Sequence, residues 1–163
     1  MATSVTAETT SYTFDDRNIR WYTLGDFEHF VFAMLDVDVS QKIVDFLVKY
    51  EPNQQIFLHR HLALTNTLVV QGEHRMYEPT GVLRMCPVGS YESNPPGDTH
   101  RDGAGDEEAV VFYSVRGKDG ILFEILDDDL NVVGTLSMDD FIGAWQEQKN
   151  RTREPTFKGW PQA

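Results

Sequence analysis

The apolar residues of this chain recur mainly at every second position, which is the period of a β-strand. In one run, Val44, Phe46 and Val48 share one face of an extended chain, and the apolar residues between them share the other. Turn-forming glycine, proline and asparagine residues separate the runs at short intervals. The pattern therefore predicts an all-β sandwich or barrel of many short strands. The predicted strands cover the ranges 30–37, 42–50, 56–61, 67–71, 82–86, 89–93, 109–116 and 121–126.

Near the carboxyl end the period of the apolar residues changes to that of a helix. Ser137 and Asp140 have the spacing of a capping box, in which the side chain of each residue binds the backbone N–H of the other. Phe141, Ile142 and Trp145 then form an apolar stripe. We expect one C-terminal α-helix, which packs across the barrel.

Length and composition place further limits on the fold. A chain of 163 residues can form one domain with a buried core, and no repeat or linker divides it. We therefore expect a single domain over residues 1–163, in which the ends, 1–13 and 151–163, are loosely ordered or form an interface. The single cysteine, Cys86, excludes an intrachain disulfide, and no secretory signal is visible, so we expect a cytoplasmic protein.

The charge of the chain limits its partners. Its 14 Lys and Arg residues against 26 Asp and Glu residues give a formal net charge of -12. A field of this sign repels nucleic-acid phosphates and anionic lipid headgroups, and no apolar stretch approaches the roughly 20 residues of a membrane span. We expect neither a nucleic-acid nor a membrane partner. Because the exposed sheet edges of such folds commonly pair, we do expect a homodimer or homotetramer.

Two histidines in the segment His59-Arg60-His61 are the first candidates for chemistry. They close a predicted strand, so alternation directs both imidazoles to the same side of the sheet, roughly 6.5–7 Å apart. Two rings at this spacing can converge on one ion at metal–nitrogen distances of about 2.0–2.2 Å. A single histidine is more often a surface or structural residue, and we interpret His29 and His74 in this way.

A second segment supplies a third histidine and a resemblance to a known family. It contains a glycine, five residues, Pro-x-Gly, two residues and a histidine, in the form of Gly89, Pro95, Gly97 and His100. Together with the His-x-His pair and the later Gly72, this spacing resembles the two motifs of the cupin family. The resemblance implies an antiparallel jelly-roll barrel, which agrees with the period-two pattern.

The resemblance also implies that His59, His61 and His100 bind a divalent metal inside the barrel. The usual cupin adds a glutamate four to six residues after its His-x-His pair, whereas the stretch 64–67 reads Leu-Thr-Asn-Thr and has no carboxylate. Three neutral imidazoles leave a divalent ion its full double charge, which favours an anionic oxygen ligand such as an enolate. This variant resembles the three-histidine cupin dioxygenases, which use ferrous iron to cleave acetylacetone or 2,4'-dihydroxyacetophenone.

Two more residues are candidates for the site. Asn66 stands at the position of the missing glutamate, where its amide could contact a metal-bound water or a substrate oxygen; a turn-stabilising role is an equal alternative. Glu78 could supply a carboxylate ligand from a strand between the two motifs, although a solvated residue before the Pro79 turn is the more common situation.

These features lead to one functional expectation and two alternatives. We expect an Fe(II)-dependent dioxygenase that binds a small ketone or enolate substrate and dioxygen, and that breaks a C–C bond of a diketone or hydroxyketone. The first alternative is a non-redox cupin enzyme, an isomerase, lyase or hydrolase, that uses Zn, Ni or Mn as a Lewis acid. The second is a cupin module that binds a metal or a ligand without catalysis.

The three-histidine ligand set predicts a pH dependence of metal binding. Histidine binds a metal only when it is neutral, so protons compete for the same nitrogens. With an ordinary imidazole pKa of about 6.5, the metal content should fall below about pH 6. Metal analysis after dialysis at about pH 5 and at neutral pH measures this fall. Stoichiometric metal at the lower pH would instead indicate an additional carboxylate ligand, such as Glu78, or an unusual burial of the histidines.

Overall fold

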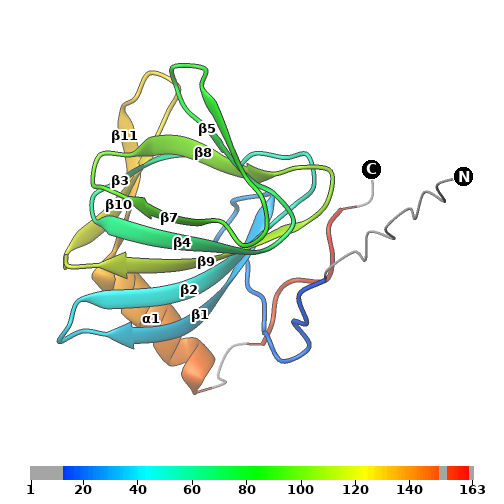
Figure 1. Cartoon of the computed structure of the whole chain (residues 1–163). Helices are drawn as coiled ribbons and strands as arrows, with labels where there is room; N and C mark the ends of the chain where they lie inside the picture. The colour runs from blue at the N-terminus through cyan, green and yellow to red at the C-terminus, as the bar shows by residue number, and fades with distance from the viewer. Residues whose placement is uncertain (1–12, 151–153, 162–163) are drawn as a thin grey trace, which may run out of the picture.

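The computed structural model describes residues 13–150 and 154–161, which form two antiparallel sheets around an apolar core, followed by a helix (Figure 1). The elements are β1 (Phe30–Asp38), β2 (Ile43–Tyr50), β3 (Leu58–His61), β4 (Leu64–Gln71), β5 (His74–Tyr77), β6 (Leu83–Cys86), β7 (Tyr91–Asn94), β8 (Thr99–Ala104), β9 (Ala109–Arg116), β10 (Ile121–Leu126), β11 (Val132–Ser137) and α1 (Met138–Lys149).

The order of the strands defines a jelly roll. The five-stranded sheet runs β1-β2-β9-β4-β7, and the six-stranded sheet runs β11-β10-β3-β8-β5-β6. Many neighbours are therefore distant in the sequence, and the chain crosses repeatedly from one sheet to the other, as in a double-sheet jelly roll. This confirms the predicted fold class, an antiparallel jelly-roll barrel with a C-terminal helix.

Alternation along the strands directs one set of side chains into the barrel and the other set outward. In β9, Val111, Tyr113 and Val115 belong to the core between the sheets. Val110 and Phe112 belong to a second apolar cluster on the opposite face of the same sheet. This second cluster explains why several strands are apolar on both faces.

Segments before β1 and after α1 cover the second cluster. Trp21 belongs to it, and Phe157 and Trp160 of the segment 154–161 pack against it. The indole Nε1 of Trp160 donates a hydrogen bond to Oε2 of Glu108 over 2.7 Å. This part of the predicted loose end therefore packs on the chain's own sheet. Most of the other predicted loose residues lie outside the described part, namely 1–12, 151–153 and 162–163.

The sequence pattern does not predict three of the strands, β5, β8 and β11. The first two bury polar side chains where alternation requires apolar ones, with His74 on β5 and Asp102 on β8. β11 is an edge strand whose Val132 and Val133 are exposed, so it has no clear buried face. The apolar pattern fails where side chains are buried for reasons other than hydrophobicity, or where a strand is exposed. The other strands agree with the predicted ranges to within a few residues.

The helix α1 joins the two sheets. Its capping box is present as predicted, because the N–H of Asp140 donates to Ser137 Oγ over 3.2 Å and the N–H of Ser137 donates to Asp140 Oδ2 over 2.7 Å. Phe141 stacks on Phe46 of β2 and contacts Phe123 of β10, with ring centroids 5.3 and 6.0 Å apart. The helix therefore packs on residues of both sheets. Within residues 13–150 and 154–161, we find no helix with the length and apolar character of a membrane span.

Gly72, the glycine that follows the His-x-His pair in the first motif, lies at a close approach of two chain segments. Its φ is +68°, and a Cβ at this position would lie 2.3 Å from the backbone oxygen of Glu108. The residue therefore has to adopt a left-handed conformation and has no room for a side chain.

We expect Gly72→Ala to reduce the free energy of unfolding more than Gly117→Ala does. Gly117 has a φ of +81°, but no atom lies within 4 Å of a Cβ placed there. Alanine at this position is therefore destabilised only by the left-handed backbone conformation, which costs about 1–2 kcal/mol. At Gly72 the backbone clash should add about 1–3 kcal/mol. Urea unfolding of both variants measures the difference. Equal losses would mean that the contact with Glu108 does not constrain this position.

Candidate metal centre

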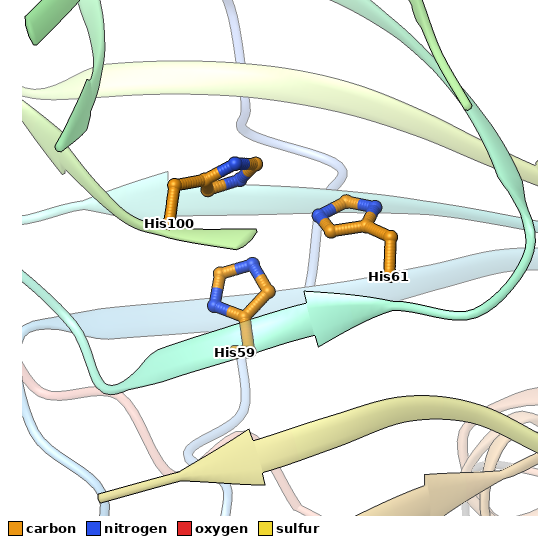
Figure 2. Close-up of side chains that lie close together, drawn as sticks. All are labelled: His59, His61 and His100. Atoms are coloured by element: carbon orange, nitrogen blue, oxygen red, sulfur yellow. The ribbon is translucent and has the colours of Figure 1, made fainter. Parts of the chain in front are cut away.

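Three histidines from two neighbouring strands meet inside the barrel, and Figure 2 shows their rings turned toward one another. His59 and His61 come from β3 and His100 from β8, and the antiparallel register pairs His59 directly with His100. All three are buried, with at most 5% of each residue exposed. Their ring centroids lie 4.8–5.2 Å apart, and one ligand nitrogen of each ring lies within 4.8 Å of the others. The fold brings together the three residues that the motifs single out.

Hydrogen bonds to the first two rings direct their Nε2 atoms at the centre. Nδ1 of His59 lies 3.1 Å from the carbonyl oxygen of Phe57, which can only accept a hydrogen. Nδ1 of His61 lies 3.0 Å from Thr65 Oγ1, whose own hydrogen is donated to the carbonyl oxygen of Ala63 over 3.2 Å. Both rings therefore carry a hydrogen on Nδ1, and in the neutral ring the Nε2 lone pair is left for a ligand.

Charged groups hold the third ring. Nδ1 of His100 lies 3.3 Å from Asp98 Oδ2, and both carboxylate oxygens of Asp98 lie 3.0 Å from Nη2 of Arg84. Burial raises the pKa of Asp98, but the hydrogen bonds from His100 and Arg84 outweigh it and hold the pKa below its usual value. Asp98 is therefore ionised and accepts a hydrogen from Nδ1, so His100 also directs Nε2 to the centre.

A divalent metal fits this set of donors. Among the described residues, Nε2 of His61 is buried without a hydrogen-bond partner, which is costly unless a ligand binds there. Burial, and then the neighbouring His59 and His100, hold the pKa of His61 well below its ordinary value, so its lone pair is available. Imidazole nitrogens suit Zn, Fe, Ni and Cu. The three histidines could therefore hold any of several transition metals.

A fourth buried group, Asp102 on β8, lies beside the histidines and was missed from the sequence. Its carboxylate oxygens lie 3.3 Å from His59 Nε2 and 3.2 Å from His100 Nε2. Burial raises the pKa of Asp102, but the surrounding histidines, His100 first, outweigh it and hold the pKa well below the usual range. Conversely, burial lowers the pKa of His100, but Asp102 and Asp98 raise it to about 9. Positive charge is therefore stabilised next to this carboxylate.

Asp102 was detectable in principle, because it follows His100 at the same spacing that separates His59 from His61. Period two directs residues 100 and 102 to the same face of β8. The motif ends at His100, and the apolar pattern predicts no strand directly after it.

Asp102 also anchors a chain of buried polar groups that reaches the interior cavity. Nε2 of His74 donates to Asp102 Oδ1 over 2.8 Å, and the hydroxyl of Tyr113 lies 3.4 Å from the same nitrogen. The hydroxyls of Tyr113 and Tyr50 lie 2.6 Å apart. Burial, and then the negative charge of Asp102, raise the pKa of both phenols well above the usual 10. Both tyrosines therefore keep their hydrogens and can act as donors.

An apolar cavity of about 110 Å³ opens beside His59 and His61. Its wall is mainly aromatic and aliphatic and comes from both sheets and from α1. This volume is smaller than the roughly 150 Å³ of a protein cavity that holds benzene, so only a small organic molecule would fit. The polar residues that reach it are Tyr50, His59, His61, Asp102, Tyr113 and Asp140.

The two other candidate residues lie apart from the histidines. Asn66 follows Thr65 on β4, and because Thr65 faces His61, alternation places Asn66 on the opposite face of the sheet. Glu78 directly follows β5, and its Oε1 lies 3.1 Å from Nε of Arg84. Among the described residues, Glu78 does not belong to the group of possible metal ligands, and neither Glu78 nor Asn66 lines the cavity. The structure thus gives Thr65, and not Asn66, the contact with a candidate ligand.

The fold and the buried histidines together define a cupin. The family model described as the ChrR cupin-like domain matches residues 9–118, a range that contains both motifs and all three histidines. The chain belongs to this family. No curated protein matches the chain in sequence.

Solved structures with the same fold differ in activity. An RmlC-like cupin protein from Ralstonia eutropha JMP134 matches with a TM-score of 0.68 and 15% identity over 91% of this chain and 93% of that one. An acetylacetone dioxygenase from Acinetobacter johnsonii matches with a TM-score of 0.65 and 16% identity over 90% of this chain and 96% of that one. The polyketide cyclase RemF from Streptomyces resistomycificus matches with a TM-score of 0.55 and 13% identity over 81% of this chain and 91% of that one. At these identities the similarity establishes the fold alone.

We expect Thr65→Val to weaken metal binding while the protein remains folded. Valine has nearly the shape of threonine but lacks the oxygen that accepts from His61, and the loss of such a supporting contact typically costs about 10–100-fold in metal affinity. Competition with a chelator for a divalent metal measures the affinity. Thr67→Val, at a second buried threonine of β4, is the matched control and should leave the affinity unchanged. Equal losses would assign the effect to packing of the strand.

Proposed function

We propose that this chain is an Fe(II)-dependent dioxygenase that cleaves a carbon–carbon bond of a small diketone or hydroxyketone. The observation that carries the proposal is that His59 and His61 form part of the wall of an otherwise largely apolar cavity of about 110 Å³. A small substrate in this cavity lies directly beside the site that three imidazoles could give to a metal. The motif resemblance to three-histidine dioxygenases and the shared fold with an acetylacetone dioxygenase support this choice of chemistry.

The three histidines would hold the ion in a fixed position. When bound, Fe(II) supplies Lewis-acid and dioxygen chemistry. The protein supplies orientation, because the second nitrogen of each ring is held by Phe57, Thr65 or Asp98. The aromatic wall excludes water, which limits side reactions of an oxidised substrate.

Tyr50 and Tyr113 give the cavity two hydrogen-bond donors. Their mutual contact uses one of their two hydroxyl hydrogens, and the other remains to be donated to Asp102 or to an oxygen of the substrate. A donor at this place would stabilise the negative charge that develops on an enolate oxygen. The cavity thus combines an apolar wall with groups that favour one orientation of a ketone.

The proposed reaction needs no external reductant. One diketone and one dioxygen give one carboxylic acid and a second carbonyl compound, and both oxygen atoms of dioxygen end in the products. The substrate itself supplies the electrons that reduce dioxygen, because the carbon–carbon bond breaks and the carbon atoms that it joined become oxidised.

A non-redox metal enzyme is the second candidate. It is favoured by Asp102 and the two protonated tyrosines, which give the cavity a hydrogen-bond acceptor and donors that could orient a polar substrate beside a metal without dioxygen. An isomerase, lyase or hydrolase with Zn, Ni or Mn would use the same histidines.

Oxygen uptake tests the proposal directly. The protein is purified without oxygen, loaded with Fe(II) and mixed with a panel of β-diketones and hydroxyacetophenones. We expect uptake with at least one of them, and a loss on the order of 100-fold or more in His59→Ala, His61→Ala and His100→Ala, because each change removes one proposed ligand.

Arg60→Gln is the matched control. Arg60 lies between the two histidines of β3 but pairs with Glu124, with 2.7 Å between Nη1 and Oε2, so this variant should retain uptake. Uptake that persists in the histidine variants would contradict the proposal. Turnover of a substrate with Zn, Ni or Mn in the absence of oxygen, without any uptake by the iron form, would favour the second candidate.

A further inference from the structure

The wall of the interior cavity contains a row of rings that begins at one of the three histidines. His61 contacts Phe123 of β10 with 5.0 Å between ring centroids, and Phe123 lies 6.0 Å from Phe141 of α1. Phe141 stacks on Phe46 of β2 at 5.3 Å, and Phe46 stacks on Tyr113 of β9 at 5.2 Å. All five residues line the cavity. The row crosses from the six-stranded to the five-stranded sheet, and Phe141 is the member at which it crosses.

Phe141 differs from the other members of this row in its position. The other four belong to strands, and at most 8% of each is exposed. Phe141 belongs to the helix and is only half-buried, as are its neighbours Leu136 and Ala144, which also line the cavity. The segment from Leu136 to Ala144 therefore closes the cavity where the wall is nearest to the surface.

Phe141 can change the size of the cavity without a change at the proposed metal ligands. Phe123 packs directly against His61, and the hydroxyl of Tyr113 lies 3.4 Å from Nε2 of His74, so a substitution of either residue would also disturb the polar groups. The ring of Phe141 instead contacts Phe46 and Phe123, which are both apolar. Its ring is thus a boundary of the cavity and not a support of the histidines.

The volume of the cavity limits the groups that a substrate can carry. The cavity has about 110 Å³, whereas an apolar cavity of roughly 150 Å³ binds benzene. Protein interiors are close-packed, so the wall does not yield freely to a larger guest. Methyl and ethyl groups suit this volume, and a phenyl ring exceeds it.

We propose that Phe141 sets the size limit of the cavity, so that the substrate is a ketone with short aliphatic groups and aryl ketones are excluded. This inference rests on the proposed function and narrows its substrate class to the aliphatic diketones and hydroxyketones. Truncation of Phe141 leaves its ring volume empty, because the surrounding structure relaxes only partially. The enlarged cavity then has room for an aromatic ring.

Benzene is a probe of this limit that needs neither metal nor turnover. The metal-free protein is titrated with benzene, and binding is followed by the shifts of the methyl and aromatic NMR signals of the protein. Phe141→Ala should bind benzene at least about tenfold more tightly than the unaltered protein, because even one methylene group changes affinity for an apolar pocket by about 10–200-fold.

Substrate preference is the second readout. The Fe(II)-loaded protein is supplied with pentane-2,4-dione and, separately, with 1-phenylbutane-1,3-dione, which replaces one methyl group by a phenyl ring. In Phe141→Ala the ratio of kcat/KM for the phenyl compound to kcat/KM for the methyl compound should rise at least about tenfold. A general loss of stability would lower both values and leave their ratio unchanged.

Ile142→Ala is the matched control. Ile142 follows Phe141 on α1 and packs against the core, but in the described part of the chain it does not line the cavity. This variant loosens the packing of the helix without enlarging the cavity, so benzene binding and the substrate ratio should stay unchanged.

Ala144→Leu tests the limit in the opposite direction. Ala144 lines the cavity one turn after Phe141, so a larger side chain there should raise the KM for pentane-2,4-dione by about tenfold or more. This variant and the milder Phe141→Leu keep the test decisive if Phe141→Ala does not fold.

The outcomes separate the two proposals. Tight benzene binding by the unaltered protein, or an equal gain in Phe141→Ala and Ile142→Ala, would show that Phe141 does not set the limit, and the proposed function would still stand. If the unaltered iron protein consumes oxygen with none of the ketones, the proposed function fails, whereas the benzene titration still measures the size limit.

Discussion

The candidate centre depends on the hydrogen bonds that hold the outer nitrogen of each histidine. A backbone oxygen of Phe57, the hydroxyl of Thr65 and the carboxylate of Asp98 each accept from an Nδ1 atom, so all three Nε2 atoms are directed to one point. Because the rings are at most 5% exposed, water cannot replace these acceptors. Without them the rings could exchange the positions of hydrogen and lone pair, and the three donors would no longer converge.

The register of the strands determines which polar side chains of β5 and β8 lie next to the histidines. Pairing of β3 with β8 sets His59 opposite His100, and the next inward position of β8 then holds Asp102. His74 reaches that carboxylate from β5, the neighbour of β8 on its other side. Burying these polar side chains is tolerated because each makes at least one hydrogen bond or ion pair inside the barrel. The apolar packing of α1 and the aromatic wall stabilises the barrel around them.

Electrostatic effects differ between the surface and the interior. The chain has a net charge of -12, but salt screens the field of exposed charges beyond about 10 Å. The interior site instead gathers three imidazoles around one carboxylate, and a bound divalent ion would make it positive. An anionic intermediate of the proposed reaction, such as an enolate, would therefore be stabilised by the site itself and not by the charge of the whole protein.

The sequence by itself determined an all-β fold and the capped helix, because strand alternation and helix capping are local properties of the chain. The resemblance of its motifs to those of cupins implied the jelly roll and the meeting of the three histidines. Tertiary structure decided which other groups join them. The alternation of inward and outward side chains does not continue predictably through a turn. The turn between β3 and β4 therefore decides that Thr65, and not Asn66, faces His61. The pairing of Glu78 with Arg84 and the approach of His74 to Asp102 depend on contacts between strands, which no period along one strand can specify.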